Sequence, residues 1–398
     1  MTLLEQLRHR LDVLSARNLR RTRLSTSSPC APEVVVEGQP WLAFNSNDYL
    51  GLAADPRVVA ALQEGAARYG AGSGASHLIS GHSLAHEQLE ERLAELLVDH
   101  IDAVRTLYFS TGYMANLAVL TSLVDAAQGD CMVFSEELNH ASLIDGIRLS
   151  KAPFCVYPHG DLQTLDTQLT SSSARHKIVV TDGVFSMDGD IAPLPELLAL
   201  CEQHGAWLFV DDAHGFGTLG TQGHGILEHF DLRSPHLVYV GTLGKAAGVS
   251  GAFVAAHATV IDWMVQRARP YIYTTAAAPA LAHALLTSLD IITSPEGQER
   301  RSQLQRHIQR FQNTPLLDHW KRLTSSTAVQ PLIIGSNPDV MRAAGALQAQ
   351  SLWVTAIRAP TVPEGSARLR ITFSAAHTDD QVTRLIDALH ALRLESLG

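Results

Sequence analysis

The sequence has no long hydrophobic run. No stretch of about 18 consecutive apolar residues, the length that suggests a membrane-spanning helix, occurs among its 398 residues. Its first residues lack the basic and then apolar pattern of a secretory signal peptide. We therefore expect a cytoplasmic protein with no membrane partner.

Cysteine is scarce, and the histidines are scattered. The four cysteines (Cys30, Cys131, Cys155 and Cys201) show no CxxC spacing, which favours small buried side chains over disulfides or metal ligands. The 19 histidines form neither an HExxH motif nor a Cys/His cluster, the patterns that usually mark metal sites. We expect no metal site.

Aromatic and basic residues are also few. Aromatic side chains make up 6% of the chain, and 40 acidic residues against 30 basic ones give a net charge of −10. Such an acidic chain is not expected to bind nucleic acid as a general partner. Hydrophobic residues are abundant, at 46%, which at this length allows a large core divided over more than one domain.

Short apolar runs alternate with helical patterns in the middle of the chain. The candidate strands are residues 106–109, 178–181, 207–210, 237–240 and 252–254. This alternation indicates a mostly parallel sheet covered by helices on both faces. In such sheets, ligands bind at the loops that follow the strands.

Beyond about residue 285 the pattern changes to a helix, a β-ladder and a final helix. Residues 368–374 alternate like a half-buried strand, with Leu369, Ile371 and Phe373 inward. Thr378 and Gln381 form a capping box at the start of the last helix. Its apolar stripe at helical spacing consists of Val382, Leu385, Ile386, Leu389 and Leu392.

The N-terminal arm is basic in an otherwise acidic chain. Its arginines are Arg8, Arg10, Arg17, Arg20, Arg21 and Arg23. Leucines at positions 3, 7, 11 and 14 predict an amphipathic helix, either docked on the body or simply solvated on a charged face. We expect an arm over residues 1–50, a large domain over 51–285 and a small α+β domain over 286–398.

A lysine in a glycine-rich loop is the most informative feature of the chain. Lys245 stands in Gly-Thr-Leu-Gly-Lys-Ala-Ala-Gly-Val-Ser-Gly, residues 241–251, directly after the predicted strand 237–240. Such a loop delivers the lysine to the carboxyl edge of a sheet, among residues small enough for a flat cofactor to approach. The amine there can form a Schiff base with an aldehyde cofactor and later act as a base. Taken alone, the segment favours a surface lysine in a turn.

Two polar residues follow the preceding predicted strand. Asp211 and His214 come directly after residues 207–210. A carboxylate at the end of a buried strand needs a positive partner, and a protonated pyridine nitrogen, which makes its ring an electron sink, is one. His214 is placed to donate to a ring hydroxyl. Singly, Asp211 fits a helix N-cap and His214 a polar turn, but the order Asp-x-x-His, strand and Gly-flanked Lys245 is far more specific.

These motifs resemble the pyridoxal-phosphate enzymes of fold type I and, within them, the α-oxoamine synthases, which join an amino acid to an acyl thioester with loss of carbon dioxide. The resemblance spans nearly the whole chain, from residues 44–52 through 181–190 to 367–371. It implies an α/β fold with a large domain, whose mostly parallel sheet of the seven-stranded type is covered by helices, and a smaller C-terminal α+β domain. It also implies pyridoxal 5'-phosphate as cofactor and a homodimer.

The resemblance assigns roles to residues around the cofactor. The implied catalytic residues are Lys245, His140 and Asp211, and the implied cofactor-binding set is Lys245, Gly112, Tyr113, His140, Ser186, Asp211, His214, Thr242 and Thr275. Gly112 and Tyr113 would bind the phosphate at a helix start, together with Thr242. Thr275, or Thr274 beside it, would reach the phosphate of the neighbouring subunit. His140 would lie flat on the ring and donate to the acyl oxygen as charge develops there, and Ser186 would lie with His214 near the ring hydroxyl.

The resemblance also implies a substrate-binding set: Arg20, Asn47, Arg358, Thr361 and Arg370. An α-carboxylate favours a bidentate guanidinium, and the resemblance gives that role to Arg370, which by itself fits a salt-bridged strand arginine. Arg358 and Thr361 lie on a proline-bearing loop that moves in the family. Arg20 would meet the distal carboxylate of the acyl chain.

Residues 353–358 and 360–363 favour the family members that condense L-alanine with a pimeloyl thioester, carried by coenzyme A or by acyl carrier protein. Two alternatives stay open: a sibling synthase that uses glycine or serine with another acyl-CoA, and a non-catalytic scaffold of the same fold. One departure concerns Ala75 and His77, where relatives carry Gly and then usually Arg or Gly. That loop lies near the acyl entrance in the family, so the acyl-chain preference also stays open.

Overall fold

The structure, a computed structural model, describes residues 1–315 and 320–395. Its internal contacts divide the chain into two compact units. The larger unit comprises Asn47–Ser186 and Asp190–Leu304, and the smaller one comprises Met1–Ser46, Met187–Gly189 and Gln305–Gly398. By contacts, the division therefore falls after Ser46 and after Leu304. The domain bounds at residues 50 and 285 stay a prediction.

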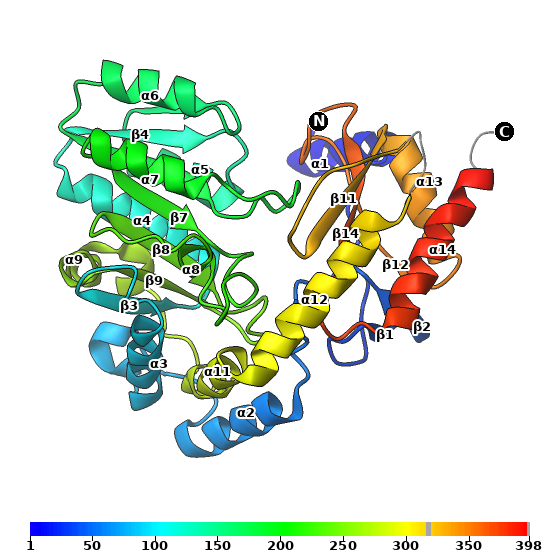
Figure 1. Cartoon of the computed structure of the whole chain (residues 1–398), viewed down its shortest axis with the longest axis horizontal. Helices are drawn as coiled ribbons and strands as arrows, with labels where there is room; N and C mark the ends of the chain where they lie inside the picture. The colour runs from blue at the N-terminus through cyan, green and yellow to red at the C-terminus, as the bar shows by residue number, and fades with distance from the viewer. Residues whose placement is uncertain (316–319, 396–398) are drawn as a thin grey trace. The chain divides into compact units, whose positions relative to one another are not determined.

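The larger unit is built on a seven-stranded sheet (Figure 1), with strand order β3-β9-β8-β7-β6-β4-β5. The strands are β3 (Val104–Phe109), β4 (Cys131–Glu136), β5 (Phe154–Tyr157), β6 (His176–Asp182), β7 (Trp207–Asp211), β8 (Leu237–Thr242) and β9 (Ala252–His257). Every pair is parallel except those of β9, which runs antiparallel to β3 and to β8. The mostly parallel sheet is confirmed, and each of the five candidate strands lies inside an observed one.

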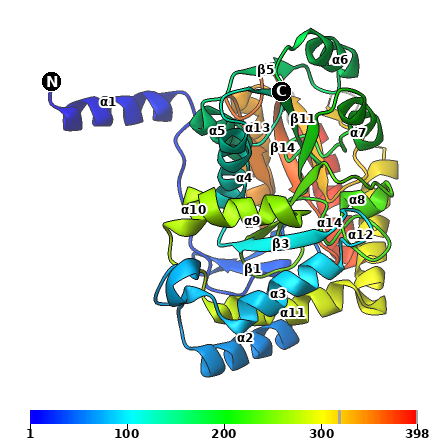
Figure 2. The same ribbon diagram turned by 90° about the vertical axis from the view of Figure 1, so that its left-hand side faces the viewer.

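Helices cover this sheet because its strands are apolar on both faces. All the residues of β7 except Trp207, and all those of β8 except Thr242, are buried, as expected for central parallel strands. The helices of this unit are α2 (Pro56–Tyr69), the π-helix η1 (His77–Gly81), α3 (Leu84–Glu95), α4 (Gly112–Ala126), α5 (Ala141–Ser150), α6 (Leu162–Ser171), α7 (Leu194–Gln203), α8 (Ile226–His229), α9 (Ala258–Arg267), α10 (Arg269–Ile272) and α11 (Pro279–Ile292). The helix α12 (Pro295–Asn313) belongs to this unit up to Leu304 and to the smaller unit from Gln305. Figure 2 shows α2 alongside α11, with which it packs.

The strand register brings the ends of β6, β7 and β8 to one edge of the sheet. Asp182 pairs with Asp211, and Asp211 pairs with Val240. The loops that follow these three strands therefore start side by side, which is where an open α/β sheet binds its ligand.

The smaller unit holds two sheets and three complete helices within the described residues. One sheet has the order β1-β2-β12 and the other has β10-β11-β14-β13. The elements are α1 (Leu3–Ala16), β1 (Glu33–Val36), β2 (Gln39–Ala43), β10 (Lys321–Arg322), β11 (Val329–Gly335), α13 (Asn337–Gln348), β12 (Leu352–Trp353), β13 (Thr355–Ile357), β14 (Ala367–Thr372) and α14 (Asp379–Glu395).

The last helix agrees with its sequence pattern, whereas the strand before it does not. The Thr378 and Gln381 side chains each accept the other's backbone N–H, and the five apolar stripe residues of α14 are buried. In β14, however, all six residues are buried, including Arg368 and Arg370. The expectation of a half-buried strand is therefore wrong, because both faces of β14 are covered.

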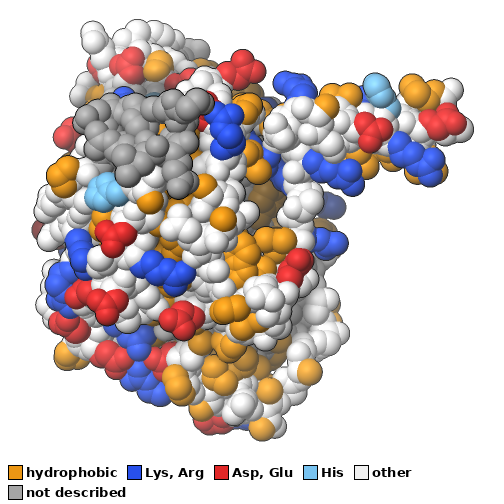
Figure 3. Space-filling model, turned by 90° about the vertical axis from the view of Figure 1, so that its right-hand side faces the viewer, with side chains coloured by type: hydrophobic (Ala, Val, Ile, Leu, Met, Phe, Trp, Pro, Cys, Tyr) orange, Lys and Arg blue, Asp and Glu red, His pale blue; other side chains and the backbone are white. Residues whose placement is uncertain are grey.

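The arm forms the predicted helix, but this helix does not dock in the single chain. Thr2 and Glu5 make a capping box at the start of α1. No residue of α1 is buried, so the expectation of a docked helix is wrong for the isolated chain. Figure 3 shows basic and hydrophobic side chains next to each other along this arm.

None of the four cysteines forms a disulfide in the described structure, and only two of them are buried as predicted. Cys131 and Cys201 are buried, Cys155 is partly buried and Cys30 is exposed. The Sγ atom of the exposed Cys30 lies 3.2 Å from the hydroxyl oxygen of Ser46, so the expectation of a buried side chain is wrong for Cys30. Among the described residues, no helix is both long and apolar enough to span a bilayer.

Candidate active site

The amine of Lys245 contacts an imidazole at the carboxyl edge of the sheet. Its Nζ lies 2.8 Å from Nε2 of His214, and Nδ1 of His214 lies 2.5 Å from the Tyr49 hydroxyl oxygen. The Tyr49 hydroxyl donates to Oδ1 of Asn47 at 3.2 Å. Because the Tyr49 hydroxyl hydrogen is used for Asn47, Nδ1 of His214 donates a hydrogen bond to the Tyr49 oxygen. Nε2 of His214 then accepts a hydrogen bond from the Lys245 ammonium. The chain Asn47, Tyr49, His214 thus orients the lysine amine.

Asp211 ends β7 and is buried, with 5% of its surface exposed. Its Oδ1 accepts the N–H of Ala213 at 3.0 Å, and its Oδ2 accepts Nδ2 of Asn116 at 2.6 Å. Within the described part of the chain, Asp211 forms no ion pair. A buried carboxylate without a cation is unfavourable, so this site fits a ligand with a positive charge.

A second carboxyl lies at the end of the neighbouring strand. Burial raises the pKa of Asp182 well above its usual range, and the charge of Asp211 raises it further. Oδ2 of Asp182 accepts the backbone N–H of His140 at 2.9 Å. This bond fixes the start of α5 beside the end of β6.

His140 is the N-cap of α5 and is exposed. Its Nδ1 accepts the N–H of Ser142 at 3.3 Å and lies 2.7 Å from the Ser142 hydroxyl. Partial burial of the ring lowers the pKa of His140; Asp211 opposes this shift and Lys245 adds to it. The neutral imidazole therefore carries its proton on Nε2, where it is a donor.

The residues predicted to bind the cofactor phosphate, Gly112 and Thr242, lie close to each other. A Cβ on Gly112, the first residue of α4, would come within 2.8 Å of Cγ2 of Thr242. Glycine thus lets the helix start approach the end of β8 without displacing the Thr242 side chain. The Thr242 hydroxyl donates to the carbonyl of Ala213 at 3.0 Å, and the Tyr113 hydroxyl donates to Asp145. The phosphate roles of these residues stay predictions.

The glycines around Lys245 serve packing. A Cβ on Gly248 would lie 2.5 Å from the backbone of Leu52 and Ala53, and one on Gly251 would lie 2.5 Å from the Tyr108 ring. Both have positive φ, 71° and 101°, a region that favours glycine. These two glycines therefore allow close contacts with the protein itself, and the approach of a flat cofactor to this loop stays a prediction.

The remaining predicted residues belong to other segments of the chain. Ser186 is half-buried after β6, and Thr275 is exposed after α10. Arg20, Arg358, Thr361 and Arg370 belong to the smaller unit. There, Arg370 is buried on β14 and donates to the Thr372 hydroxyl at 3.2 Å, and Arg358 donates to the carbonyl of Asn18. Arg20 and Thr361 are exposed.

The sequence analysis missed a histidine held between two carboxylates. His159 lies with Nδ1 2.7 Å from Glu136 and Nε2 2.9 Å from Asp190. Asp190 first, and then Glu136, raise the pKa of His159 to about 10. This bridge connects the end of β4 with the loop that carries Ser186. Tyr49 and Asn116 were missed as well, since no local pattern marks them.

The cluster fits pyridoxal 5'-phosphate. Asp211 offers a buried charge for a protonated ring nitrogen, and Lys245 offers an amine for the aldehyde. The first-turn N–H groups of α4, beside Gly112, suit a phosphate group. Oδ1 of Asn116 is buried without a hydrogen-bond partner among the described residues, which is consistent with a polar ligand nearby.

Comparisons with known proteins agree with this geometry. Residues 39–389 match the sequence profile of the family described as aminotransferase class I and II. Relatives described as 8-amino-7-oxononanoate synthase from Janthinobacterium sp. and Bordetella petrii are 64% and 62% identical; the alignments cover 98% and 100% of this chain, and 98% and 99% of the relatives. A solved structure described as SPT with a PLP internal aldimine is similar with a TM-score of 0.88, at 27% identity over 98% of each chain.

Proposed function

Because the chain belongs to the class I and II aminotransferase family and, within it, to the 8-amino-7-oxononanoate synthases, we propose that it condenses L-alanine with a pimeloyl thioester, with loss of carbon dioxide. The product is 8-amino-7-oxononanoate, in biotin biosynthesis. The observation that carries this proposal is the Lys245 amine 2.8 Å from His214, on the sheet edge that also presents Asp211, in a chain 64% identical to a relative of that name.

The residues of the larger unit would hold and move protons. When bound, pyridoxal 5'-phosphate supplies an aldehyde for the amine of the amino acid and a ring that accepts electrons from its α-carbon. Asp211 would keep a proton on the ring nitrogen. Lys245 would hold the aldehyde before substrate arrives and then remove the α-proton, with His214 orienting its amine. His140 would donate from Nε2 to the thioester oxygen as negative charge develops there.

Positively charged residues would select the two carboxylates of the substrates. We assign the α-carboxylate of alanine to Arg370, because a guanidinium can donate two parallel hydrogen bonds to the two carboxylate oxygens. Asn47 would contribute to the same pocket. The distal carboxylate of the pimeloyl chain is assigned to Arg20, with Arg358 and Thr361 on the moving loop. The acyl carrier is coenzyme A or acyl carrier protein. A homodimer, with Thr275 of one chain near the phosphate of the other, completes the proposal.

Covalent labelling tests the role of Lys245. The chain has four lysines, Lys151, Lys177, Lys245 and Lys321, so peptide mapping gives a clear answer. Borohydride added to the protein with its cofactor should attach the cofactor to Lys245 alone. Lys245→Ala should lose turnover by about 1,000-fold or more, because the base is removed, whereas Lys321→Ala should keep it. Label on another lysine would overturn the assignment.

A substrate panel tests the reaction itself. Alanine, glycine and serine are each offered with pimeloyl thioesters of coenzyme A and of acyl carrier protein, and carbon dioxide and aminoketone are measured. Alanine should give the highest kcat/KM, although one methyl group discriminates by only about 10- to 200-fold. A preference for glycine or serine would identify a sibling synthase, and no turnover with any pair would favour a scaffold.

A further inference from the structure

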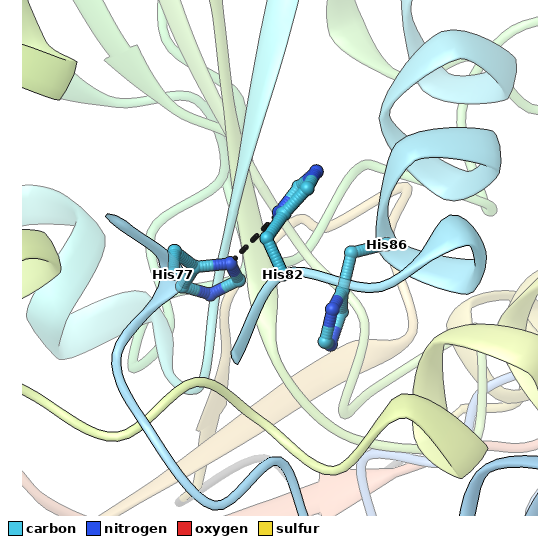
Figure 4. A group of neighbouring side chains, drawn as sticks. All are labelled: His77, His82 and His86. Carbon is cyan, nitrogen blue, oxygen red and sulfur yellow. Dashed lines mark hydrogen bonds between the residues drawn. The ribbon is translucent and has the colours of Figure 1, made fainter. Parts of the chain in front are cut away.

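Three histidines from one short segment converge at the start of α3 in the larger unit. One ring nitrogen from each of His77, His82 and His86 lies within 4.8 Å of the other two. The Nδ1 atoms of His77 and His82 are 3.0 Å apart. Figure 4 shows the three side chains next to one another, between η1 and α3. The sequence analysis expected no metal site, because it found neither an HExxH motif nor a Cys/His cluster, whereas the structure brings these three histidines together.

The rings of His77 and His86 are buried and held in place. His77 stacks on Tyr271, with centroids 4.6 Å apart and an interplanar angle of 11°. His86 donates from Nε2 to the carbonyl of Ala277 at 2.9 Å, which leaves the lone pair on Nδ1, where it accepts the N–H of Ser83 at 3.1 Å. A ring N–H bound to a backbone carbonyl is the usual support of a metal-binding histidine.

The backbone that carries these histidines is fixed on both sides. The Ser73 hydroxyl donates to the carbonyl of Ala276 at 2.9 Å, and the N–H of Ala276 donates to the carbonyl of Ala75 at 3.0 Å. A Cβ on Gly81 would lie 2.1 Å from that same carbonyl, so the turn between His77 and His82 is tight. The imidazoles are therefore brought together by the fold before any ligand arrives.

We propose that His77, His82 and His86 bind one divalent transition-metal ion of the kind that prefers imidazole, such as Zn²⁺. Three histidines with a fourth position open to solvent are an established Zn²⁺ arrangement, and the exposed His82 places that open position at the surface. The ion replaces the Ser83 N–H at Nδ1 of His86. It links η1 with α3 and, through the Ala277 carbonyl, with the segment after α10.

Calorimetric titration of the full chain, loaded with its cofactor and dialysed against a chelator, tests this site. Zn²⁺ should bind with a stoichiometry of one. His82 is exposed, so His82→Ala should fold normally. It should weaken Zn²⁺ binding by more than roughly 10- to 100-fold, the effect of losing a group that only hydrogen-bonds to a metal ligand. His9→Ala removes an exposed histidine outside the cluster and should leave the affinity unchanged.

A second variant separates ligation from folding. His86→Gln keeps an amide donor for the Ala277 carbonyl but removes the imidazole, and it should also lose Zn²⁺ binding. Zn²⁺ should raise the unfolding temperature of the parent protein and that of His9→Ala, but not that of His82→Ala. No stoichiometric binding to the parent, or binding that survives both His82→Ala and His86→Gln, would overturn the proposal. Neither measurement depends on the enzyme's activity.

Discussion

The carboxylate of Asp211 uses one lone pair on each oxygen for a protein donor and makes no ion pair in the described structure. Its charge is therefore left for a ligand. Asp211→Asn should stay folded, at a loss of about 1–3 kcal/mol, because the amide cannot accept from both Ala213 and Asn116. Its rate of exchanging the α-proton of alanine should fall about 100-fold or more, as an amide does not keep the ring nitrogen protonated.

Proton NMR in deuterated buffer measures this exchange directly. Asp262→Asn is a matched control, since Asp262 is an exposed surface carboxylate and its replacement should leave the exchange rate unchanged. An Asp211→Asn protein that exchanges the proton at the parental rate would show that this carboxylate has no electron-sink role.

His159 makes part of the stability depend on pH. Its pKa in the folded protein is about 10, above the ordinary value of 6.5, chiefly because of Asp190. A raised pKa means that the bridge contributes fully below pH 6.5 and is lost as the pH rises towards 10. The other groups around the ring are Glu136, Glu137, whose carboxylate accepts the His159 backbone N–H, and Phe185.

Urea unfolding at pH 6.5 and at pH 10 tests this bridge. The parent protein should lose stability between the two values. His159→Gln should lose less, because glutamine carries no proton to release, and His176→Gln, at an exposed histidine, should behave like the parent. If His159→Gln and the parent show the same loss, the bridge does not contribute.

At the scale of whole elements, the start of α2 supports the site from a distance. Asp55 caps α2 by accepting the N–H of Arg57 at 3.0 Å, and it also accepts Nη2 of Arg300 at 2.7 Å. Arg300 donates in turn to the carbonyl of Leu50 at 2.8 Å, next to Tyr49. Asp55 and Arg300 therefore hold in place the segment that contains Tyr49, whose hydroxyl group contacts His214.

Asp55→Ala should lower the free energy of unfolding by about 1–3 kcal/mol, because it removes a helix cap and one of the two carboxylates that bind Arg300, the other being Glu296. Thermal or urea unfolding gives this value. Asp102→Ala breaks an exposed ion pair with Arg233 and should change stability by about 1 kcal/mol or less. Equal effects in the two variants would argue against a structural role of the cap.

Local patterns predicted the elements that depend on local rules. The capping box of α14 and the buried strands β7 and β8 follow from their own residues, and so does the placement of Asp211 and Lys245 at strand ends. The covering of β14 on its second face was not predictable, because it depends on elements far away in sequence. The same holds for Tyr49, which meets His214 across 165 positions, and for His159.

At the scale of the whole molecule, the basic arm stands out against a net charge of −10. Arg20 is exposed, and its Nη1 lies 3.5 Å from the Ser15 hydroxyl. If Arg20 binds the distal carboxylate of the acyl chain, Arg20→Ala should raise the KM for the pimeloyl thioester about tenfold. This factor corresponds to the smallest free energy typical of a hydrogen bond to a charged group. Added salt should shrink this effect.

The control substrate is an acyl thioester of equal length that lacks the terminal carboxylate, for which the KM should not change. Arg8→Ala, on the exposed helix α1, serves as the control variant and should change neither constant. Equal increases in KM for the two substrates would show that Arg20 does not recognise the distal carboxylate and that the arm has only a structural role.

The pairing of β3 with β9 also determines when the sheet can be completed during synthesis. Within the seven-stranded sheet, β3 is made first but occupies an edge, where its neighbour is β9. The strands β4 to β8 come between them in the chain, so they emerge and can assemble while β3 still waits. At 5–20 residues per second, this wait lasts roughly ten seconds. The apolar residues of β3, such as Leu107 and Phe109, stay without their sheet neighbour for that time, which makes the nascent chain a natural client for chaperones.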